Sequence, residues 1–284
     1  MLERIYVEIG NICNLSCSFC PGTSKAKRQM SEAEFAAVCE KIKGHTKNIY
    51  LHVMGEPLLH PKLDGFLKIA KENGLSVCIT TNGVLLGKTG QVLLDNSKTI
   101  HKISISLHAL EGNGRNIDRD YLKIVSDFAK EAALRGIFVV MRLWNQDSAE
   151  EMGKNTQNAE IEAFLQGEFD AQWQLRPRGY RLAKFIFLEY DGVFTWPSDS
   201  KAEKLEEGFC HGLSGQAAIL ADGTVVPCCL DANGQLELGN IFRSSMGEIL
   251  ESPRARAILE GFASGKIVEP MCQTCTFARR FKIR

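Results

Sequence analysis

The chain has 284 residues, and its 34 lysines and arginines are balanced by 34 aspartates and glutamates. This balance gives no long-range field that would favour nucleic acid or an anionic membrane, and the longest apolar runs, about five residues, are far shorter than a membrane-spanning helix. The sequence begins in a strand-like pattern without a secretory signal segment, so we expect a cytoplasmic protein. Its ten cysteines then indicate metal binding rather than disulfides, because cytosolic thiols stay reduced.

Strand and helix patterns alternate along the first two thirds of the chain. Apolar and β-branched segments predict strands at residues 5–9, 48–53, 75–80, 100–107 and 137–143, and more weakly at 173–175 and 185–189. Amphipathic segments predict helices at residues 31–43, 61–73, 89–96, 120–135 and 158–169. The aromatic segment 176–196 is expected to form the sixth strand and a hairpin rather than a substrate pocket. The alternation predicts a parallel sheet with right-handed crossovers, either an open doubly wound sheet or a full or partial barrel.

Three cysteines, Cys13, Cys17 and Cys20, follow the first predicted strand in one short loop. A structural zinc ion normally has four protein ligands, whereas three thiolates on a four-iron, four-sulfur cluster leave one iron free to bind another molecule. The spacing therefore favours an iron–sulfur cluster with an open coordination position, and a zinc knuckle is the alternative.

The ends of the next three predicted strands carry further candidate residues, because function in such folds gathers at the carboxyl ends of the strands. The second strand ends in a turn with Gly55 and Glu56, where a glycine lets backbone carbonyls approach an ammonium group. The third ends at Asn82, and the fourth places Ser104 and Ser106 on one face. We expect that face to line the interior, with Ser106 nearer the carboxyl end.

A second set of cysteines lies near the C-terminal end, after the strand–helix pattern has stopped. The set consists of Cys210, Cys228, Cys229, Cys272 and Cys275. Two short apolar strands joined by Asp-Gly, a strong hairpin signal, precede the adjacent pair, and a distant CxxC closes the set. This layout is typical of a metal site, for which zinc alone would be the usual metal.

The first cysteine loop, with the aromatic Phe19 before the third cysteine, resembles the CxxxCxφC signature of the radical S-adenosylmethionine (SAM) superfamily. The turns at 54–57 and 81–83 resemble the GGEP and TNG motifs of that family, with Met54 in place of the first glycine. The resemblance implies a partial (β/α)6 barrel, a three-cysteine 4Fe-4S cluster whose open iron binds the SAM amino and carboxylate groups, and an aromatic near the adenine.

The same resemblance implies which residues contact SAM. In relatives a serine at the end of the fourth strand touches the SAM carboxylate or ribose, and either Arg119 or Arg142 could pair with that carboxylate. Arg142 is preferred because it lies at the end of the fifth predicted strand, whereas His108 is expected to be structural. The implied cofactor-binding residues are Phe19, Gly55, Glu56, Asn82, Ser104, Ser106, Arg119 and Arg142. No residue is identified as the general base.

Together with the radical SAM motif, the C-terminal cysteines resemble the first part of a SPASM domain, which carries auxiliary iron–sulfur clusters. Only one CxxC follows, which is similar to the shorter twitch variant with one four-cysteine 4Fe-4S cluster. The implied ligands are Cys210, Cys228, Cys272 and Cys275, and Cys228 is preferred over Cys229 by the Gly-x4-Cys spacing. Cys229 would then be spare, and we expect it to be buried; the alternative is that it faces the barrel, where its thiol could donate a hydrogen atom to a substrate radical. The resemblance divides the chain into a barrel at 1–197 and a small α+β domain at 198–284.

The resemblance implies an oxidoreductase that cleaves SAM to a 5′-deoxyadenosyl radical and abstracts hydrogen from a substrate carbon. A fully ligated auxiliary cluster favours a net two-electron oxidation, and peptide crosslinking or epimerisation is the alternative. Peptide-modifying relatives often carry a leader-binding domain before the first cluster. Only twelve residues precede Cys13, so we consider a leader-guided peptide substrate less favoured than a small molecule. We expect an external one-electron donor such as flavodoxin or ferredoxin, a small-molecule or peptide substrate, and neither nucleic acid nor membrane. A non-catalytic zinc or iron–sulfur regulator is the alternative from another class.

Overall fold

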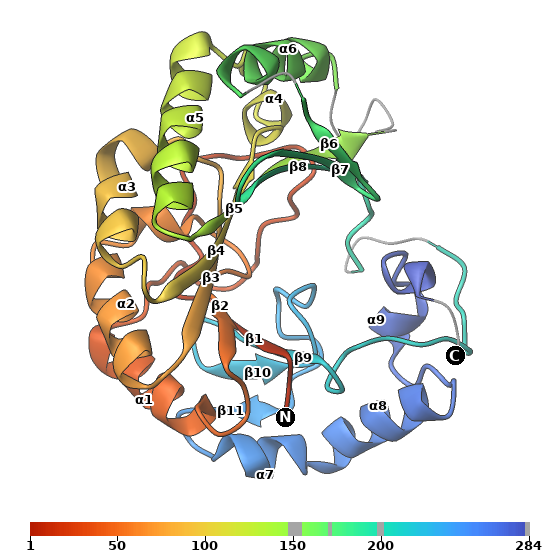
Figure 1. The fold of residues 1–284 in the computed structure, drawn as a ribbon. Helices are drawn as coiled ribbons and strands as arrows, with labels where there is room; N and C mark the ends of the chain where they lie inside the picture. The colour runs from red at the N-terminus through yellow and green to blue at the C-terminus, as the bar shows by residue number, and fades with distance from the viewer. Residues whose placement is uncertain (147–154, 170–171, 198–201, 282–284) are drawn as a thin grey trace.

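The structure is a computed structural model that describes residues 1–146, 155–169, 172–197 and 202–281. One curved sheet runs through the molecule, and helices cover its outer side (Figure 1). The predicted domain boundary between residues 197 and 198 borders residues 198–201, which lie outside the described part. Within the described ranges, no helix is long and apolar enough to cross a bilayer.

The sheet has the strand order β11-β10-β9-β1-β2-β3-β4-β5-β8-β7-β6. The strands are β1 (Arg4–Val7), β2 (Asn48–Tyr50), β3 (Ser76–Thr81), β4 (Ile100–Ser106), β5 (Phe138–Gln146), β6 (Gln174–Arg176), β7 (Gly179–Ala183), β8 (Ile186–Gly192), β9 (Gln216–Ile219), β10 (Thr224–Val226) and β11 (Gly239–Asn240). β1 to β5 and β8 are parallel neighbours, whereas β6 and β7 pair antiparallel at one edge. These six parallel strands form the predicted partial barrel, and the expected sixth strand with its hairpin is confirmed.

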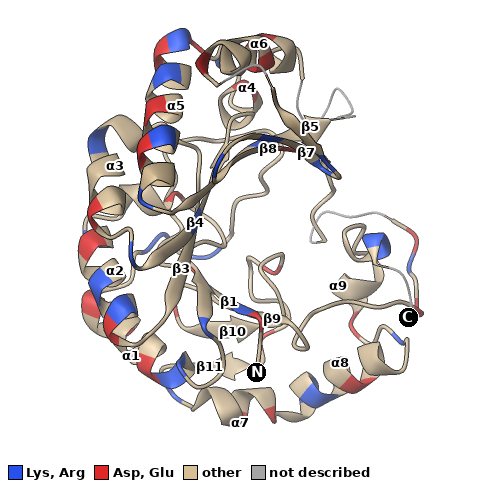
Figure 2. Cartoon of the chain, in the orientation of Figure 1, with Lys and Arg blue, Asp and Glu red and all other residues tan. Residues whose placement is uncertain are grey.

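Helices α1, α2, α3 and α5 line the outside of the curved sheet (Figure 1). The helices are α1 (Glu32–Ile42), α2 (Leu63–Glu72), α3 (Leu86–Asp95), α4 (Ala109–Gly112), α5 (Arg119–Leu134), α6 (Asn158–Glu168), α7 (Met246–Leu250), α8 (Pro253–Ala263) and α9 (Pro270–Gln273). Short 3₁₀ turns occur at Pro57–Leu59 and Ala278–Arg280. Basic and acidic residues are intermixed along the outer helices (Figure 2), so the neutral charge balance holds locally as well.

Local sequence signals explain where these elements begin and which face they bury. The Ser31 side chain accepts a hydrogen bond from the Glu34 backbone, and the Glu34 carboxylate accepts one from Ser31, which makes the capping box that starts α1. On β1, Ile5 and Val7 are fully buried against the helices, whereas Tyr6 points to the opposite, concave face. Alternation on the inner strands therefore separates an apolar helix-facing side from a mixed concave side.

One strand differs from its predicted bounds in a way that affects the site. β5 continues to Gln146, three residues beyond the predicted end, because it pairs with β8 through an irregular register between Leu143 and Gln146. Arg142 therefore lies within the strand, opposite Ser106 on β4 and Glu189 on β8, and the expectation that it ends the strand is wrong.

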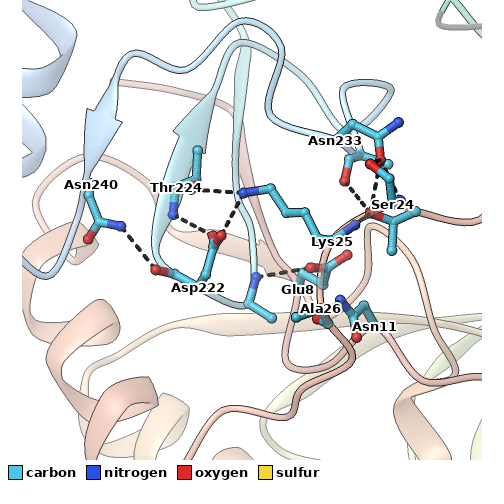
Figure 3. Close-up of polar contacts among 12 residues, drawn as sticks. Glu8, Asn11, Ser24, Lys25, Ala26, Asp222, Thr224, Asn233 and Asn240 are labelled. Atoms are coloured by element: carbon cyan, nitrogen blue, oxygen red, sulfur yellow. Dashed lines mark hydrogen bonds and ion pairs between the residues drawn. The ribbon is translucent and has the colours of Figure 1, made fainter.

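The C-terminal segment extends the barrel sheet. β9 pairs parallel with β1, and β10 returns antiparallel after the Asp222-Gly223 turn, where Gly223 has φ +84°. Lys25 Nζ lies 2.5 Å from the Asp222 carboxylate and also donates to Thr224, as Figure 3 shows. Glu8 Oε2 accepts a hydrogen bond from the backbone of Ala221 at 3.0 Å. The predicted hairpin is thus confirmed, and its contacts fix the second cysteine set against β1 and the first cysteine loop.

Candidate active site

The first cysteine loop lies between β1 and α1 and packs against α4. The Cys17 thiol donates a hydrogen bond to the Ala109 carbonyl at 3.2 Å, and the Ser18 backbone donates to the Gly112 carbonyl at 2.7 Å. Gly112 is required by this packing, because a Cβ there would come within 2.3 Å of the Phe19 ring. The loop therefore has a defined path, with Cys13 and Cys20 exposed and Cys17 half-buried.

The donor chemistry of this loop fits an iron–sulfur cluster. All ten cysteines are free thiols. Burial raises the pKa of Cys17 to about 12, and the nearby charges of Cys20 and Cys13 raise that pKa further. Coordination to iron would replace these protons and relieve the repulsion among the three thiolates. In the part of the chain that the structure describes, no three His, Cys, Asp or Glu side chains are grouped closely enough to hold a single metal ion.

The turn after β2 lies directly against this loop. Gly55 has φ +80°, and a Cβ there would come within 2.4 Å of the Gly10 carbonyl oxygen and 3.0 Å of the Ile12 backbone. The Glu56 backbone donates a hydrogen bond to the Ile12 carbonyl at 2.9 Å. Only glycine allows this approach, so Gly55 fixes the distance between the turn and the cysteine loop.

Glu56 joins the turns after β2 and β3. Its carboxylate accepts hydrogen bonds from the Thr81 hydroxyl at 2.7 Å, the Asn82 backbone at 2.8 Å and the Leu58 backbone at 3.0 Å. Burial raises the pKa of this carboxyl, and the three donors oppose that rise. The Glu56 side chain thus stabilises the turns themselves.

Asn82 connects the third strand end to the cysteine loop. Its Nδ2 donates to Asn14 Oδ1 at 2.9 Å and lies 3.9 Å from Cys13 Sγ. Tyr121 from α5 donates to the Asn82 carbonyl at 2.9 Å. The cysteine loop and the turns after β2 and β3 therefore meet at one edge of the sheet, as the sequence predicts for parallel strands.

The two serines and the two candidate arginines lie in different environments. Ser104 is buried, and among the described residues its hydroxyl has no hydrogen-bond partner, whereas Ser106 is half-buried. The Arg142 guanidinium stacks 4.2 Å above the Trp144 ring, and its buried Nε also has no partner. Arg119 is exposed at the first turn of α5.

His108 follows β4 and supports the aromatic part of the cysteine loop. Its ring lies 5.0 Å from the Phe19 ring, and its Nδ1 lies 3.1 Å from the Arg142 carbonyl oxygen. Burial lowers the pKa of His108 to about 4, so the ring is neutral at pH 7. The contacts are those of a structural histidine that positions Phe19.

The concave face carries residues that the sequence reasoning did not select. Tyr6, Tyr50, Cys78 and Lys102 occupy one row across β1 to β4, since each is registered with the next strand's residue. His52 lies above this row, 5.4 Å from the Tyr6 ring. Successive side chains on a strand point to opposite faces of the sheet, so counting every second residue from Ser104 and Ser106 could have identified the residues of the concave face.

The second cysteine set gathers beside β1. Burial raises the pKa of Cys228, and the charges of the thiols of Cys229, Cys210 and Cys272 add to this rise. Burial also raises the pKa of Cys272, to which Cys210 and Cys275 contribute. The thiols of Cys210, Cys228 and Cys272 therefore act on one another electrostatically, and Cys275 acts on Cys210 and Cys272.

Cys229 lies differently from its neighbour. It is half-buried, and its thiol interacts electrostatically with Tyr6, whose side chain lies on the concave face. Burial raises the pKa of Cys229 to about 11. The expectation of a fully buried side chain is not met, because Cys229 lies in the turn that follows β10, past the end of that strand at Val226.

Two family models match the chain. The model of the radical SAM superfamily matches residues 7–152, and the model of the SPASM iron-sulfur cluster-binding domain matches residues 210–276.

Among curated relatives, the GTP 3',8-cyclase of Chlorobaculum tepidum is 29% identical over 114 residues, which cover 39% of this chain and 34% of that protein. The tungsten-containing aldehyde ferredoxin oxidoreductase cofactor-modifying protein of Pyrococcus furiosus is 21% identical, over 97% of this chain and 87% of that protein. The match to the cyclase thus spans only about a third of its length, 34%.

Solved structures share the fold at low sequence identity. BtrN, crystallised with AdoMet and 2-DOIA, has a TM-score of 0.59 at 20% identity, covering 97% of this chain and 93% of that one. SuiB from Streptococcus suis has a TM-score of 0.62 at 17% identity, covering 92% of this chain and 68% of that one. At these identities the likeness establishes the fold.

Proposed function

Because the chain belongs to the radical SAM superfamily and carries a C-terminal SPASM domain, we propose that it is an oxidoreductase that removes two electrons from a substrate carbon centre. When bound, the first cluster and SAM supply the radical that removes the hydrogen atom, and the auxiliary cluster supplies an acceptor for the electron left on the substrate. The remaining proton leaves to a base, so the substrate loses one hydrogen atom, one electron and one proton. An external one-electron donor such as flavodoxin or ferredoxin would reduce the first cluster.

The convergence of the cysteine loop with the turns after β2 and β3 is the observation that carries this proposal. Cys13, Cys17 and Cys20 would hold the first 4Fe-4S cluster, and the backbone at Gly55 would face the SAM ammonium. The hydrogen bonds of Glu56 and Asn82 hold that edge in place, which supports a SAM site there.

The remaining proposed SAM contacts come from the adjacent strands. Phe19 would pack near the adenine, and His108 supports its ring. Ser104 and Ser106 would face the SAM carboxylate or ribose. Of the two arginines, Arg142 lies on the concave side with an unpartnered Nε, which favours it over the exposed Arg119 as the partner of the SAM carboxylate.

We assign the auxiliary 4Fe-4S cluster to Cys210, Cys228, Cys272 and Cys275. Their mutual electrostatic contacts support one shared site. Four ligands would leave no open iron, which favours electron transfer over direct substrate binding. The proposed division into residues 1–197 and 198–284 gives each segment one of the two cluster sites. The two segments share one sheet, because β9 pairs with β1 and β10 pairs with β9.

Redox-neutral epimerisation is the second candidate, and the position of Cys229 favours it. Its thiol interacts electrostatically with Tyr6 of the concave face, and from there it could return a hydrogen atom to a substrate radical. The resulting thiyl radical would then take one electron and one proton from an external thiol or the reduced electron donor. Peptide crosslinking is supported only by the fold shared with SuiB, one structure of which is bound to its precursor peptide SuiA.

Anaerobic reconstitution with iron and sulfide tests the proposal. We expect about eight irons per chain, as two 4Fe-4S clusters require, and release of 5′-deoxyadenosine from SAM after reduction. Tightly bound zinc without SAM cleavage would contradict the proposal. Reaction in D₂O separates the two candidates, because epimerisation adds one solvent-derived deuterium to the product carbon, whereas oxidation does not.

A further inference from the structure

Two cations on the concave face lack counter-ions. Lys102 projects inward from β4, and Arg142 projects inward from β5 in the row that contains Ser106. Among the residues that the structure describes, neither forms an ion pair. The carboxylate of Glu189, which is registered with Arg142 across β5 and β8, favours the charged form of both cations without forming an ion pair with either, and it offsets only one of the two charges. The inner cations, Lys102 and Arg142, therefore leave excess positive charge inside the barrel.

These two charges act on the same space. Lys102 Nζ lies 5.6 Å from the centroid of the Tyr50 ring. Burial lowers the pKa of Lys102, and the charge of Arg142 lowers it further. Burial together with both cations lowers the pKa of His52 to about 3. The protein therefore maintains two like charges that act on each other across a partly dehydrated surface, where pairing with an opposite charge is the usual arrangement.

Unpartnered polar atoms surround the same space. His52 Nδ1, Ser104 Oγ and Arg142 Nε are buried and have no hydrogen-bond partner within the part of the chain that the structure describes. Buried polar groups are normally paired, so three such atoms on one face of the sheet indicate that a bound molecule completes their contacts. Lys102, Tyr50 and His52 all keep part of their surface open to solvent, and a ligand can therefore reach them.

The carboxylate of SAM can neutralise only one of the two inner cations. Arg142 lies in the Ser106 row, at the level proposed for the SAM carboxylate, whereas Lys102 lies four residues earlier along β4. At about 3.3 Å per strand residue, these rows are about 13 Å apart. One SAM carboxylate in the upper row would leave Lys102 without a partner.

We propose that Lys102, with the Tyr50 ring beside it, binds an anionic group of the substrate, a carboxylate or a phosphate. This inference rests on the proposed function, because it places the substrate on the concave face between the two cysteine sites. The neutral His52 ring contributes an unpartnered nitrogen to the same row of contacts. Removal of one charge-assisted hydrogen bond weakens binding by about 10- to 100-fold.

Titration of the SAM-loaded holoenzyme with inorganic phosphate and with succinate, at constant ionic strength, tests the proposal by calorimetry. In the proposed arrangement SAM occupies the row of Ser106 and Arg142, so the titration reports anion binding in the row of Lys102 and Tyr50. We expect saturable binding of at least one anion, weakened about 10-fold or more by Lys102→Met and restored in large part by Lys102→Arg. The matched control Lys98→Met removes an exposed lysine just before β4 and should bind as the wild type does.

The two probes also identify the group, because preference for phosphate indicates a phosphate ester and preference for succinate indicates a carboxylate. Absence of saturable binding of either anion, or equal binding by wild type and Lys102→Met, would overturn the proposal. Release of 5′-deoxyadenosine without substrate, measured on the same samples, separates this failure from a failure of the proposed function. If Lys102→Met does not fold, Lys102→Gln takes its place in the same titration, and saturable binding by Lys102→Gln equal to that of the wild type would overturn the proposal.

Discussion

Substitution of Gly55 by alanine should separate the turn after β2 from the first cysteine loop. The left-handed backbone at φ +80° costs a non-glycine residue about 1–2 kcal/mol. The added methyl would also come within 2.4 Å of the Gly10 carbonyl oxygen, and such overpacking typically costs about 1–3 kcal/mol. We therefore expect Gly55→Ala to lower the free energy of unfolding by about 2–5 kcal/mol.

Gly74→Ala is the matched control, because Gly74 has φ +67° but no atom within 4 Å of the added Cβ. It should cost only the backbone contribution of about 1–2 kcal/mol. Urea unfolding of the apo-proteins, followed by circular dichroism, gives both free energies. Iron content after reconstitution and SAM affinity, measured in parallel, should fall in Gly55→Ala and stay normal in Gly74→Ala. Equal losses of stability in the two variants, with full iron and SAM binding in both, would refute the close-approach argument.

Three further substitutions test the other parts of the site. Burial raises the pKa of the Glu56 carboxyl in the folded protein, so this group lowers the free energy of unfolding as the pH rises from its pKa in the unfolded chain to its pKa in the folded protein. Glu56→Gln should remove that part of the pH dependence. An unchanged dependence of the free energy of unfolding on pH between pH 4 and 8 would contradict the assignment. Changing Cys272 and Cys275 together to alanine should remove the auxiliary cluster, keep some uncoupled SAM cleavage and abolish product; normal product yield from protein verified to lack that cluster would end its role as electron acceptor. Cys229→Ala should keep both clusters, and loss of iron in this variant but not in Cys228→Ala would reverse the proposed ligand choice.

Short-range signals in the sequence predicted most of the barrel. The capping residues of α1, the strand–helix alternation and the turn at Asp222-Gly223 all act within a few residues, and the structure has each of them. The meeting of the first cysteine loop with Gly55 and Asn82 also followed, because the carboxyl ends of parallel strands lie at one edge.

The features that the sequence did not predict depend on contacts between distant segments. The parallel pairing of β9 with β1 joins residues more than two hundred positions apart, and nothing local specifies that partner. The extension of β5 past Arg142 depends on the irregular pairing with β8. Lys102 looks like an ordinary lysine in the sequence, and only the curvature of the sheet places it beside Tyr50.

The central claim is that Cys13, Cys17 and Cys20 hold the cluster that cleaves SAM. Anaerobic assay of 5′-deoxyadenosine, with reduced and reconstituted protein, tests it most directly when wild type is compared with the variant in which all three cysteines are alanine. We predict that this variant loses roughly half of the iron and all SAM cleavage, while the wild type releases 5′-deoxyadenosine. Retained 5′-deoxyadenosine formation by the triple variant would contradict the account.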